Sequence, residues 1–232
     1  MSGIRANLLR VEERIAGAAE RAGRARDEIT LIGVTKTQPP EAIREAYEAG
    51  LRHFGENRVQ EWEGKRASLA DLDATWHFIG HLQSNKAARA TKAFHCIDSM
   101  DDFALAQRLD RARGGSGTAE KLRVLLEVHL GGEESKSGVE TGDLEGLAER
   151  VAGLPHLQLA GLMCIPPFFE NAGDARPYFR KLRESRDAVA KRLSLSLPVL
   201  SMGMSHDFEV AIEEGATEVR VGTAIFGARQ GA

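Results

Sequence analysis

Short apolar runs alternate with amphipathic stretches along almost the whole chain. Eight runs have the composition of strands buried on both faces: residues 29–35, 52–55, 75–80, 95–99, 123–130, 157–165, 197–202 and 218–222. Seven stretches between them carry apolar residues at helical spacing: 41–49, 57–69, 84–92, 101–112, 143–152, 174–193 and 206–214. The first 24 residues also have a helical period. The pattern predicts a regular alternation of strands and helices.

Eight strands joined by helical crossovers over 232 residues match a (β/α)₈ or TIM barrel in number and length. The competing arrangement, an open doubly wound sheet, would more usually stop at five or six strands. No linker divides the chain, so residues 1–232 are expected to form a single domain. Only a short helical turn fits after Gly222, at 223–229. The extra N-terminal helix is therefore expected to help complete the outer ring.

The composition is that of an ordinary soluble α/β protein, with 42% hydrophobic and 28% charged residues. A net charge of −3 gives no electrostatic footprint for nucleic acid or an anionic membrane. The N-terminus lacks the apolar core of a signal peptide, and no apolar window is long enough to span a bilayer. Cys96 and Cys164 lie in apolar runs and are typical of buried thiols in a reducing compartment. These features predict a cytoplasmic protein.

Lys36 ends the first apolar run, and the carboxyl ends of barrel strands are where working sites gather. A lysine shielded from water at such a position has a free amine available near neutral pH, which condenses with an aldehyde. Taken alone, a solvated lysine that marks the strand end is the better interpretation. The residues at the other strand ends change that balance.

The ends of the last two strands carry a candidate phosphate site. Barrels of this class often hold a phosphate between the loops that follow these strands. Gly222 permits close backbone approach, while Thr223 and Ser201 offer hydroxyl donors. A site built from backbone amides and hydroxyls is therefore expected. The alternative is that residues 222–223 form a plain turn and helix cap.

Arg220 alternates with apolar neighbours and shares a strand face with Glu218 and Gly222. If that face lines the barrel, the guanidinium points into the mouth and needs a partner. Arginine only donates hydrogen bonds, so a heterocyclic nitrogen opposite it must be neutral and accepting. A carboxylate partner, such as Glu218 or Glu56, is equally consistent. Amine, phosphate pocket and arginine together match the aldehyde, phosphate and ring nitrogen of pyridoxal 5′-phosphate.

Longer motifs surround the same strand ends. They are VTK at 34–36, HFGEN at 53–57, WHFIGHLQSNK at 76–86, SKSG at 135–138, GLM at 161–163, LSMGMS at 200–205 and VRVGTAIFG at 219–227. With these motifs the chain resembles the pyridoxal phosphate homeostasis protein family along essentially its whole length. The resemblance implies a barrel like the N-terminal domain of alanine racemase. It also implies binding, buffering and delivery of pyridoxal 5′-phosphate, with no established enzymatic activity.

The resemblance assigns seven cofactor-binding residues and no catalytic residue or metal ligand. Lys36 is the Schiff-base lysine, Asn57 lies near the cofactor ring, and Arg220 faces the pyridine nitrogen. The phosphate is held by Ser201, Met202, Gly222 and Thr223. The implied partners are the cofactor itself and, transiently, the apoenzymes that receive it.

A weak amino-acid racemase is the alternative function. Racemisation needs a base on each face of the cofactor, and alanine racemases take the second from a separate β-domain. The chain ends ten residues beyond Gly222, so no such domain is expected. The two tyrosines, Tyr47 and Tyr178, fall in predicted outer helices. An arginine at the ring nitrogen weakens the electron sink and argues against transaminase-type chemistry, whereas alanine racemases also pair an arginine with the ring. Binding and delivery are therefore favoured, and the missing partner domain favours a monomer.

Three further groups have a plain and a functional interpretation. His77 and His81 straddle a strand end and a loop, so core or mouth histidines are favoured over a zinc site. Lys136 is expected to be a loop lysine, and an anion contact or a second amine for cofactor transfer is the alternative. Residues 83–92 are basic but contain no aromatic residue, which favours a solvated helix face over an RNA site.

Overall fold

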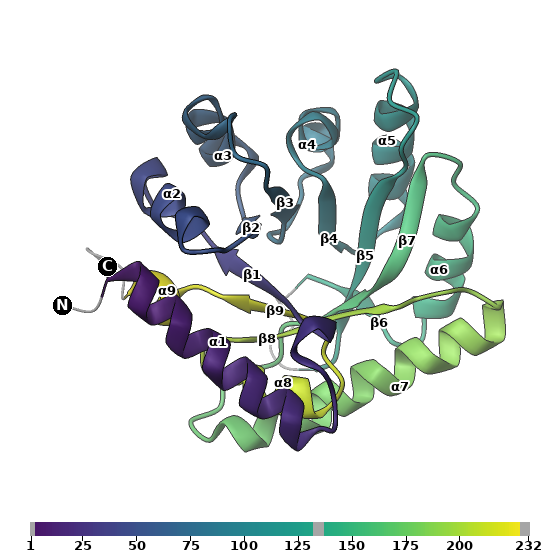
Figure 1. The fold of residues 1–232 in the computed structure, drawn as a ribbon. Coiled ribbons are helices and arrows are strands. Elements are labelled where there is room, and N and C mark those ends of the chain that lie inside the picture. Colours follow the sequence, from purple (N-terminus) through teal and green to yellow (C-terminus); the bar gives the residue numbers. More distant parts are fainter. Residues whose placement is uncertain (1–2, 132–136, 228–232) are drawn as a thin grey trace.

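A computed structural model describes residues 3–131 and 137–227. Eight parallel strands form a closed ring in the order β1-β2-β3-β4-β5-β7-β8-β9, and β9 pairs back to β1 (Figure 1). The strands are β1 Thr30–Val34, β2 His53–Glu56, β3 Thr75–Phe78, β4 Cys96–Met100, β5 Leu122–His129, β7 Leu157–Met163, β8 Val199–Met204 and β9 Glu218–Val221. The predicted (β/α)₈ barrel is confirmed. A short strand that was not predicted, β6 (Val139–Glu140), pairs with β5 outside the ring.

The outer layer consists of helices in the predicted alternation. They are α1 Ile4–Arg21, α2 Pro40–Glu48, α3 Val59–Arg66, α4 Ala87–Ala93, α5 Phe103–Gly114, α6 Leu144–Ala152, α7 Arg176–Leu193, α8 Phe208–Glu213 and α9 Thr223–Phe226. Among the described residues, no helix has both the length and the apolar character that a bilayer crossing needs.

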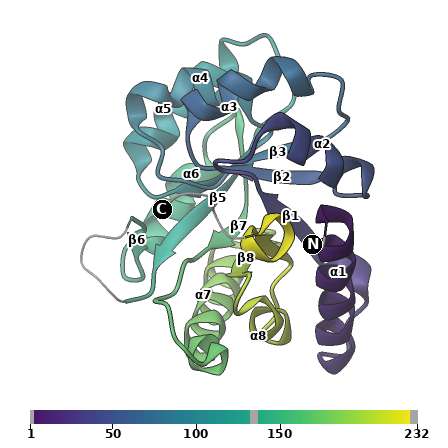
Figure 2. The ribbon, with the colours of Figure 1, turned by 90° about the vertical axis from the view of Figure 1, so that its left-hand side faces the viewer.

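Helix α1 closes the outer ring, as expected. It lies alongside α8 and contacts α9 and α2 (Figures 1 and 2). Asn7 Nδ2 donates a hydrogen bond of 2.8 Å to the carbonyl oxygen of Ile225, which ties α1 to α9. Arg14 pairs with Glu209 of α8 at 2.5 Å. These contacts hold the last strand–helix unit in place.

The hydrophobic core has two parts. The larger part fills the space between the strands and the helices. The smaller part lies inside the barrel, where Leu125, Ala160 and Met163 are buried together against Val199. Because alternate residues of a strand face opposite sides, Leu125 shares its inward face with Arg123 and Glu127. The barrel interior is therefore partly charged.

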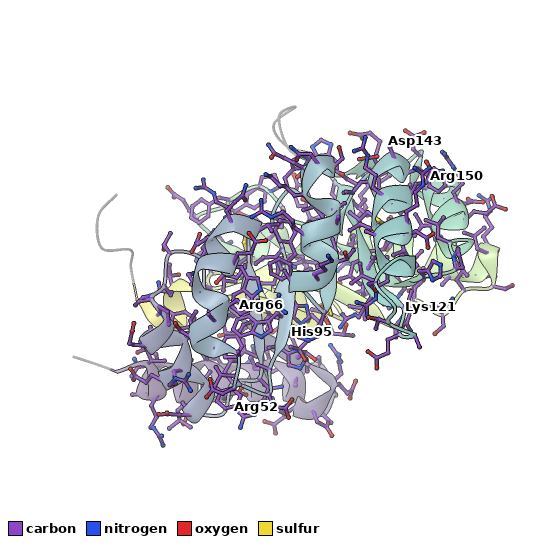
Figure 3. All side chains as sticks on the ribbon, turned by 90° about the horizontal axis from the view of Figure 1, so that it is seen from above. Arg52, Arg66, His95, Lys121, Asp143 and Arg150 are labelled. Atoms are coloured by element: carbon purple, nitrogen blue, oxygen red, sulfur yellow. The ribbon has the colours of Figure 1, made fainter. Side chains whose placement is uncertain are left out.

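The two ends of the barrel are distinguished by the direction of the parallel strands. Arg52, His95 and Lys121 directly precede β2, β4 and β5, and Figure 3 shows them toward one end of the molecule. Asp143, at the start of α6, lies toward the other end. We call the end at which the strands finish the carboxyl rim, and the opposite end the amino rim.

Among the strands, β8 differs most in position from the expected one. The sequence predicted 197–202, whereas β8 runs from Val199 to Met204. Gly203 makes the extension possible, because it has a φ of +92° and a Cβ there would lie 2.6 Å from the Cβ of Ala211. The carboxyl rim at β8 is therefore formed by residues further along the chain than expected.

Candidate functional site

A cavity of about 410 Å³ opens at the carboxyl rim. Its lining comes from the ends of six barrel strands or the loops after them: Val34, Lys36, Asn57, Ile79, Gly80, Ile165, Met204, Ser205, His206, Arg220, Gly222 and Thr223. Five of the seven predicted site residues are among them, namely Lys36, Asn57, Arg220, Gly222 and Thr223. The structure brings these distant residues together in one site.

Arg220 is almost completely buried at the base of this cavity, with 3% of its surface exposed. Its Nη1 donates to Ser201 Oγ at 2.7 Å and its Nη2 to the carbonyl oxygen of Cys164 at 2.8 Å. The two carboxylates that the sequence suggested as partners of Arg220 form ion pairs with other residues: Glu218 pairs with Arg123, and Glu56 pairs with Lys65. Neutral acceptors therefore orient the guanidinium and leave its positive charge in place.

Ser201 and Met202 lie outside the cavity lining. Ser201 is fully buried, and its hydroxyl accepts the hydrogen bond from Arg220. Met202 is also fully buried and belongs to the core between strands and helices. Because neighbouring residues of a strand face opposite sides, Ser201 supports Arg220 from inside the barrel, whereas Met202 packs on the outer side of β8.

Ser205 is a site residue that the sequence reasoning missed. Its Oγ accepts hydrogen bonds from the backbone N–H groups of Gly222 at 3.2 Å and Ala224 at 3.4 Å. Backbone donors after β9 therefore converge on an oxygen supplied by the loop after β8. Converging backbone N–H groups are a usual arrangement for an anionic oxygen. Ser205 is the last residue of the LSMGMS motif, so the motif was the sequence signal that could have identified it.

Gly80 fixes the position of Asn57. A Cβ at Gly80 would lie 2.4 Å from the carbonyl oxygen of Asn57, so only glycine allows the two loops to approach this closely. Asn57 Oδ1 is buried and has no hydrogen-bond partner among the described residues. Since buried polar atoms are normally satisfied, this oxygen is available to a donor on a bound ligand.

The two histidines considered for metal binding lie in different surroundings. His77 is buried inside the barrel, where its Nδ1 is 2.8 Å from Asp98 Oδ2 and its Nε2 is 3.1 Å from His53 Nδ1. Burial opposes the charged form, but Asp98 raises the pKa of His77 well above its usual value. The side chain of His81 is 62% exposed. Lys136, the candidate second amine, lies outside the described residues.

One trio of possible metal ligands occurs among the described residues. His77, Cys96 and Asp98 each place a ligand atom within 4.8 Å of the other two. Both ring nitrogens of His77 already have partners at hydrogen-bond distance, so we assign this group as a buried ion pair with a neighbouring thiol.

Comparison with known proteins identifies the family. A family model for the N-terminal domain of alanine racemase matches residues 6–230. The chain is 52% identical to the pyridoxal phosphate homeostasis protein of Aquifex aeolicus, over 96% of this chain and 97% of the relative. The chain belongs to the pyridoxal phosphate homeostasis protein family. Another member, from Pseudomonas aeruginosa, is 49% identical over 99% of this chain and 97% of its own.

Solved structures agree with this membership. PipY of Synechococcus elongatus, a protein solved with PLP bound, has a TM-score of 0.82 and 42% identity, covering 92% of this chain and all of PipY. The resemblance found in the sequence motifs is therefore confirmed. Members of the pyridoxal phosphate homeostasis protein family are named for homeostasis rather than for a reaction, in agreement with the expected non-enzymatic role.

Proposed function

We propose that this protein binds pyridoxal 5′-phosphate at the carboxyl rim, with Lys36 as the Schiff-base lysine. Bound there, the cofactor is buffered and delivered to apoenzymes. The observation that carries the proposal is that Lys36, Arg220, Gly222 and Thr223 line one cavity of about 410 Å³. Their amine, guanidinium, amide and hydroxyl groups match the aldehyde, ring nitrogen and phosphate of this single ligand.

Each rim residue has its own part in binding. Arg220 only donates hydrogen bonds, so it favours a neutral, accepting ring nitrogen. Thr223 and Ser205 offer hydroxyl groups for the phosphate, together with the backbone N–H groups near Gly222. Ser201 holds the guanidinium in position. Met202 packs on the outer side of β8, and Asn57 supplies a hydrogen-bond acceptor beside the ring.

Binding and delivery fit the site better than amino-acid racemisation. Arg220 disfavours protonation of the ring nitrogen, which argues against transaminase-type chemistry and is compatible with racemisation. Racemisation, however, needs a second base, and neither tyrosine lines the cavity. Tyr47 lies in α2 beneath Arg52, and Tyr178 lies in α7 against Phe169. We therefore propose a monomeric, single-domain carrier that acts in the cytoplasm.

Substitution of Lys36 tests the proposed attachment. The wild-type protein should turn yellow with pyridoxal 5′-phosphate and, after borohydride reduction, carry one adduct on the peptide that contains residue 36. Lys36→Ala should carry none, because the amine is lost. Lys181→Ala, at an exposed position of α7, is the matched control and should keep the adduct. A fully occupied adduct in Lys36→Ala would show that another residue binds the cofactor.

Isotope exchange distinguishes the carrier from a weak racemase. The protein loaded with cofactor is incubated with alanine in D₂O, and deuterium at Cα is measured by NMR. A carrier should introduce little label, because no second base reaches the substrate carbon. Steady incorporation that depends on both the cofactor and Lys36 would instead support racemase activity.

A further inference from the structure

A buried charged cluster lies directly behind the rim at Lys36. Lys65 of α3 has only 9% of its surface exposed. Its Nζ donates to Glu56 Oε1 at 3.0 Å and to Glu61 Oε1 at 2.6 Å. Glu56 ends β2 and is fully buried, whereas Glu61 lies in the first turn of α3. We call Lys65, Glu56 and Glu61 the rim clamp.

The rim clamp contacts both residues that flank Lys36. On one side, Lys65 Nζ donates to the carbonyl oxygen of Thr35 at 2.9 Å, and Thr35 Oγ1 donates to Glu56 Oε1 at 2.7 Å. On the other side, the backbone N–H of Thr37 donates to Glu61 Oε1 at 2.5 Å. The main chain of Lys36 is therefore held from both directions, while its side chain lines the cavity.

The backbone at this point is strained. Thr37 has a φ of +64°, a left-handed conformation that is unfavourable for a β-branched residue. Such a conformation persists only where the surroundings impose it. In the described part of the chain, Ser194 after α7 is the one other non-glycine residue with a positive φ. The strain thus lies immediately beside the lysine that lines the cavity.

Stability alone is a poor explanation for the rim clamp. Charged side chains are rarely buried, and apolar packing commonly stabilises a fold as well as a buried ion pair or better. Glu56 Oε2 is buried and has no hydrogen-bond partner among residues 3–131 and 137–227. Burial raises the pKa of Glu56, although the charge of Lys65 opposes this shift. The cluster is therefore maintained at an energetic cost, next to the candidate site.

We propose that the rim clamp positions Lys36, and that Lys65 is its central positioning residue. The clamp fixes the main chain at residues 35–37, so that the amine of Lys36 is held where it meets the aldehyde of pyridoxal 5′-phosphate. The amine and the aldehyde condense to a C=N bond with release of one water molecule. The clamp takes no part in these bond changes. This inference rests on the proposed role of Lys36.

Lys65→Met tests the positioning role, because it keeps the length of the side chain and removes the ammonium. Absorbance titration should show the apparent Kd for pyridoxal 5′-phosphate rising on the order of tenfold, since a misplaced reacting group loses alignment. Borohydride trapping should slow, and the adduct should still map to residue 36. Arg123→Met is the matched control, because it also removes the cation of a largely buried ion pair, with Glu218. It should lower stability but leave the Kd within about twofold.

A second pair of variants keeps the test valid if Lys65→Met fails to fold. Glu61 is partly exposed, so its substitution is better tolerated. Glu61→Gln keeps an oxygen that accepts from the Thr37 N–H and should bind as the wild type does. Glu61→Leu removes that acceptor and should bind more weakly, with slower trapping. If the role of Glu61 were merely structural, the substitutions would change the melting temperature, but the two variants would bind the cofactor equally well.

The outcomes distinguish failure of the proposed function from failure of the positioning role. A wild-type protein that forms no adduct at Lys36 would refute the proposed function. A wild-type protein that does form it, with unchanged Kd and trapping rate in the folded clamp variants, would refute the positioning role alone. Weaker binding in Lys65→Met or Glu61→Leu, with normal binding in Arg123→Met and Glu61→Gln, supports the positioning role.

Discussion

Arg220 shows how a single residue can be buried, charged and still available to a ligand. Its two defined hydrogen bonds go to a hydroxyl and a carbonyl oxygen, and neither acceptor carries a compensating charge. Burial raises the pKa of two nearby carboxyl groups, Glu127 and Asp207, although the positive charge of Arg220 opposes this shift. No carboxylate is among its hydrogen-bond partners in the described residues, so the guanidinium lines the cavity without a directly paired anion.

Arg220→Met should weaken cofactor binding and lower stability. Binding should fall on the order of tenfold or more, because a charge-assisted hydrogen bond to the ring nitrogen is lost. Stability should fall by about 1–3 kcal/mol, because the buried oxygens of Ser201 and Cys164 lose their donor. Absorbance titration and urea denaturation measure the two effects. Ser201→Ala is the control: it keeps the guanidinium and should bind the cofactor more tightly than Arg220→Met does. Equal binding in the wild type and Arg220→Met would show that Arg220 is not part of the site.

At the scale of one element, β8 determines the shape of the cavity. It continues to Met204, so that Ser205 and His206 reach the carboxyl rim. The extension depends on Gly203, whose positive φ allows the strand to pass close to α8. A Cβ at this position would lie 2.6 Å from the Ala211 Cβ and 2.8 Å from the Phe208 Cα.

Gly203→Ala should therefore destabilise the protein by about 3 kcal/mol, combining left-handed strain with overpacking against α8. Gly64→Ala is the matched control, because Gly64 lies inside α3 and an added Cβ meets no atom within 4 Å. That substitution should stabilise the protein by about 0.5–1 kcal/mol through helix propensity. Chemical denaturation of both variants gives the comparison. A Gly203→Ala protein as stable as Gly64→Ala would show that β8 tolerates a side chain there.

Most of the barrel could be predicted from the sequence, because strands buried on both faces appear as apolar runs in the local composition. The limits of β8 could not be predicted, because they depend on the contact of Gly203 with α8. Ser205 was missed for the same reason, since a strand ending at residue 202 leaves it outside the site. The rim clamp was missed because Glu61 and Lys65 have the spacing of a solvated helical pair, and only tertiary packing buries them.

At the scale of the whole molecule, the barrel interior carries charge at both ends. Arg123 and Glu218 are paired near the amino rim, whereas Glu127 and Arg220 lie toward the carboxyl rim. The inward-facing Leu125 lies between Arg123 and Glu127 along β5. The charges near the amino rim are therefore set apart from the cavity, and they include the buried pair of His77 and Asp98.

His53 and His77 make the stability of the folded protein depend on pH, and their contributions change in opposite directions. Burial, helped by the charge of His77, lowers the pKa of His53 from 6.5 to about 4. Between these values the unfolded chain binds a proton that the folded chain does not, so the contribution of His53 to stability is lost as pH falls. His77 has a raised pKa because of Asp98. Its contribution is complete below about pH 6.5 and is lost as pH rises toward the pKa of the folded state.

Comparison of His53→Gln and His77→Gln with the wild type measures these two contributions, which are linked because the charge of His77 helps to lower the pKa of His53. From pH 6.5 to 4, the stability of the wild type relative to His53→Gln should fall by about 1–2 kcal/mol, after allowing for partial solvent screening. Relative to His77→Gln, the wild type should lose stability as pH rises above about 6.5. Urea denaturation across this pH range measures both differences. Parallel curves for the wild type and both variants would mean that neither histidine changes its protonation on folding, and that the ion pair with Asp98 does not form in solution.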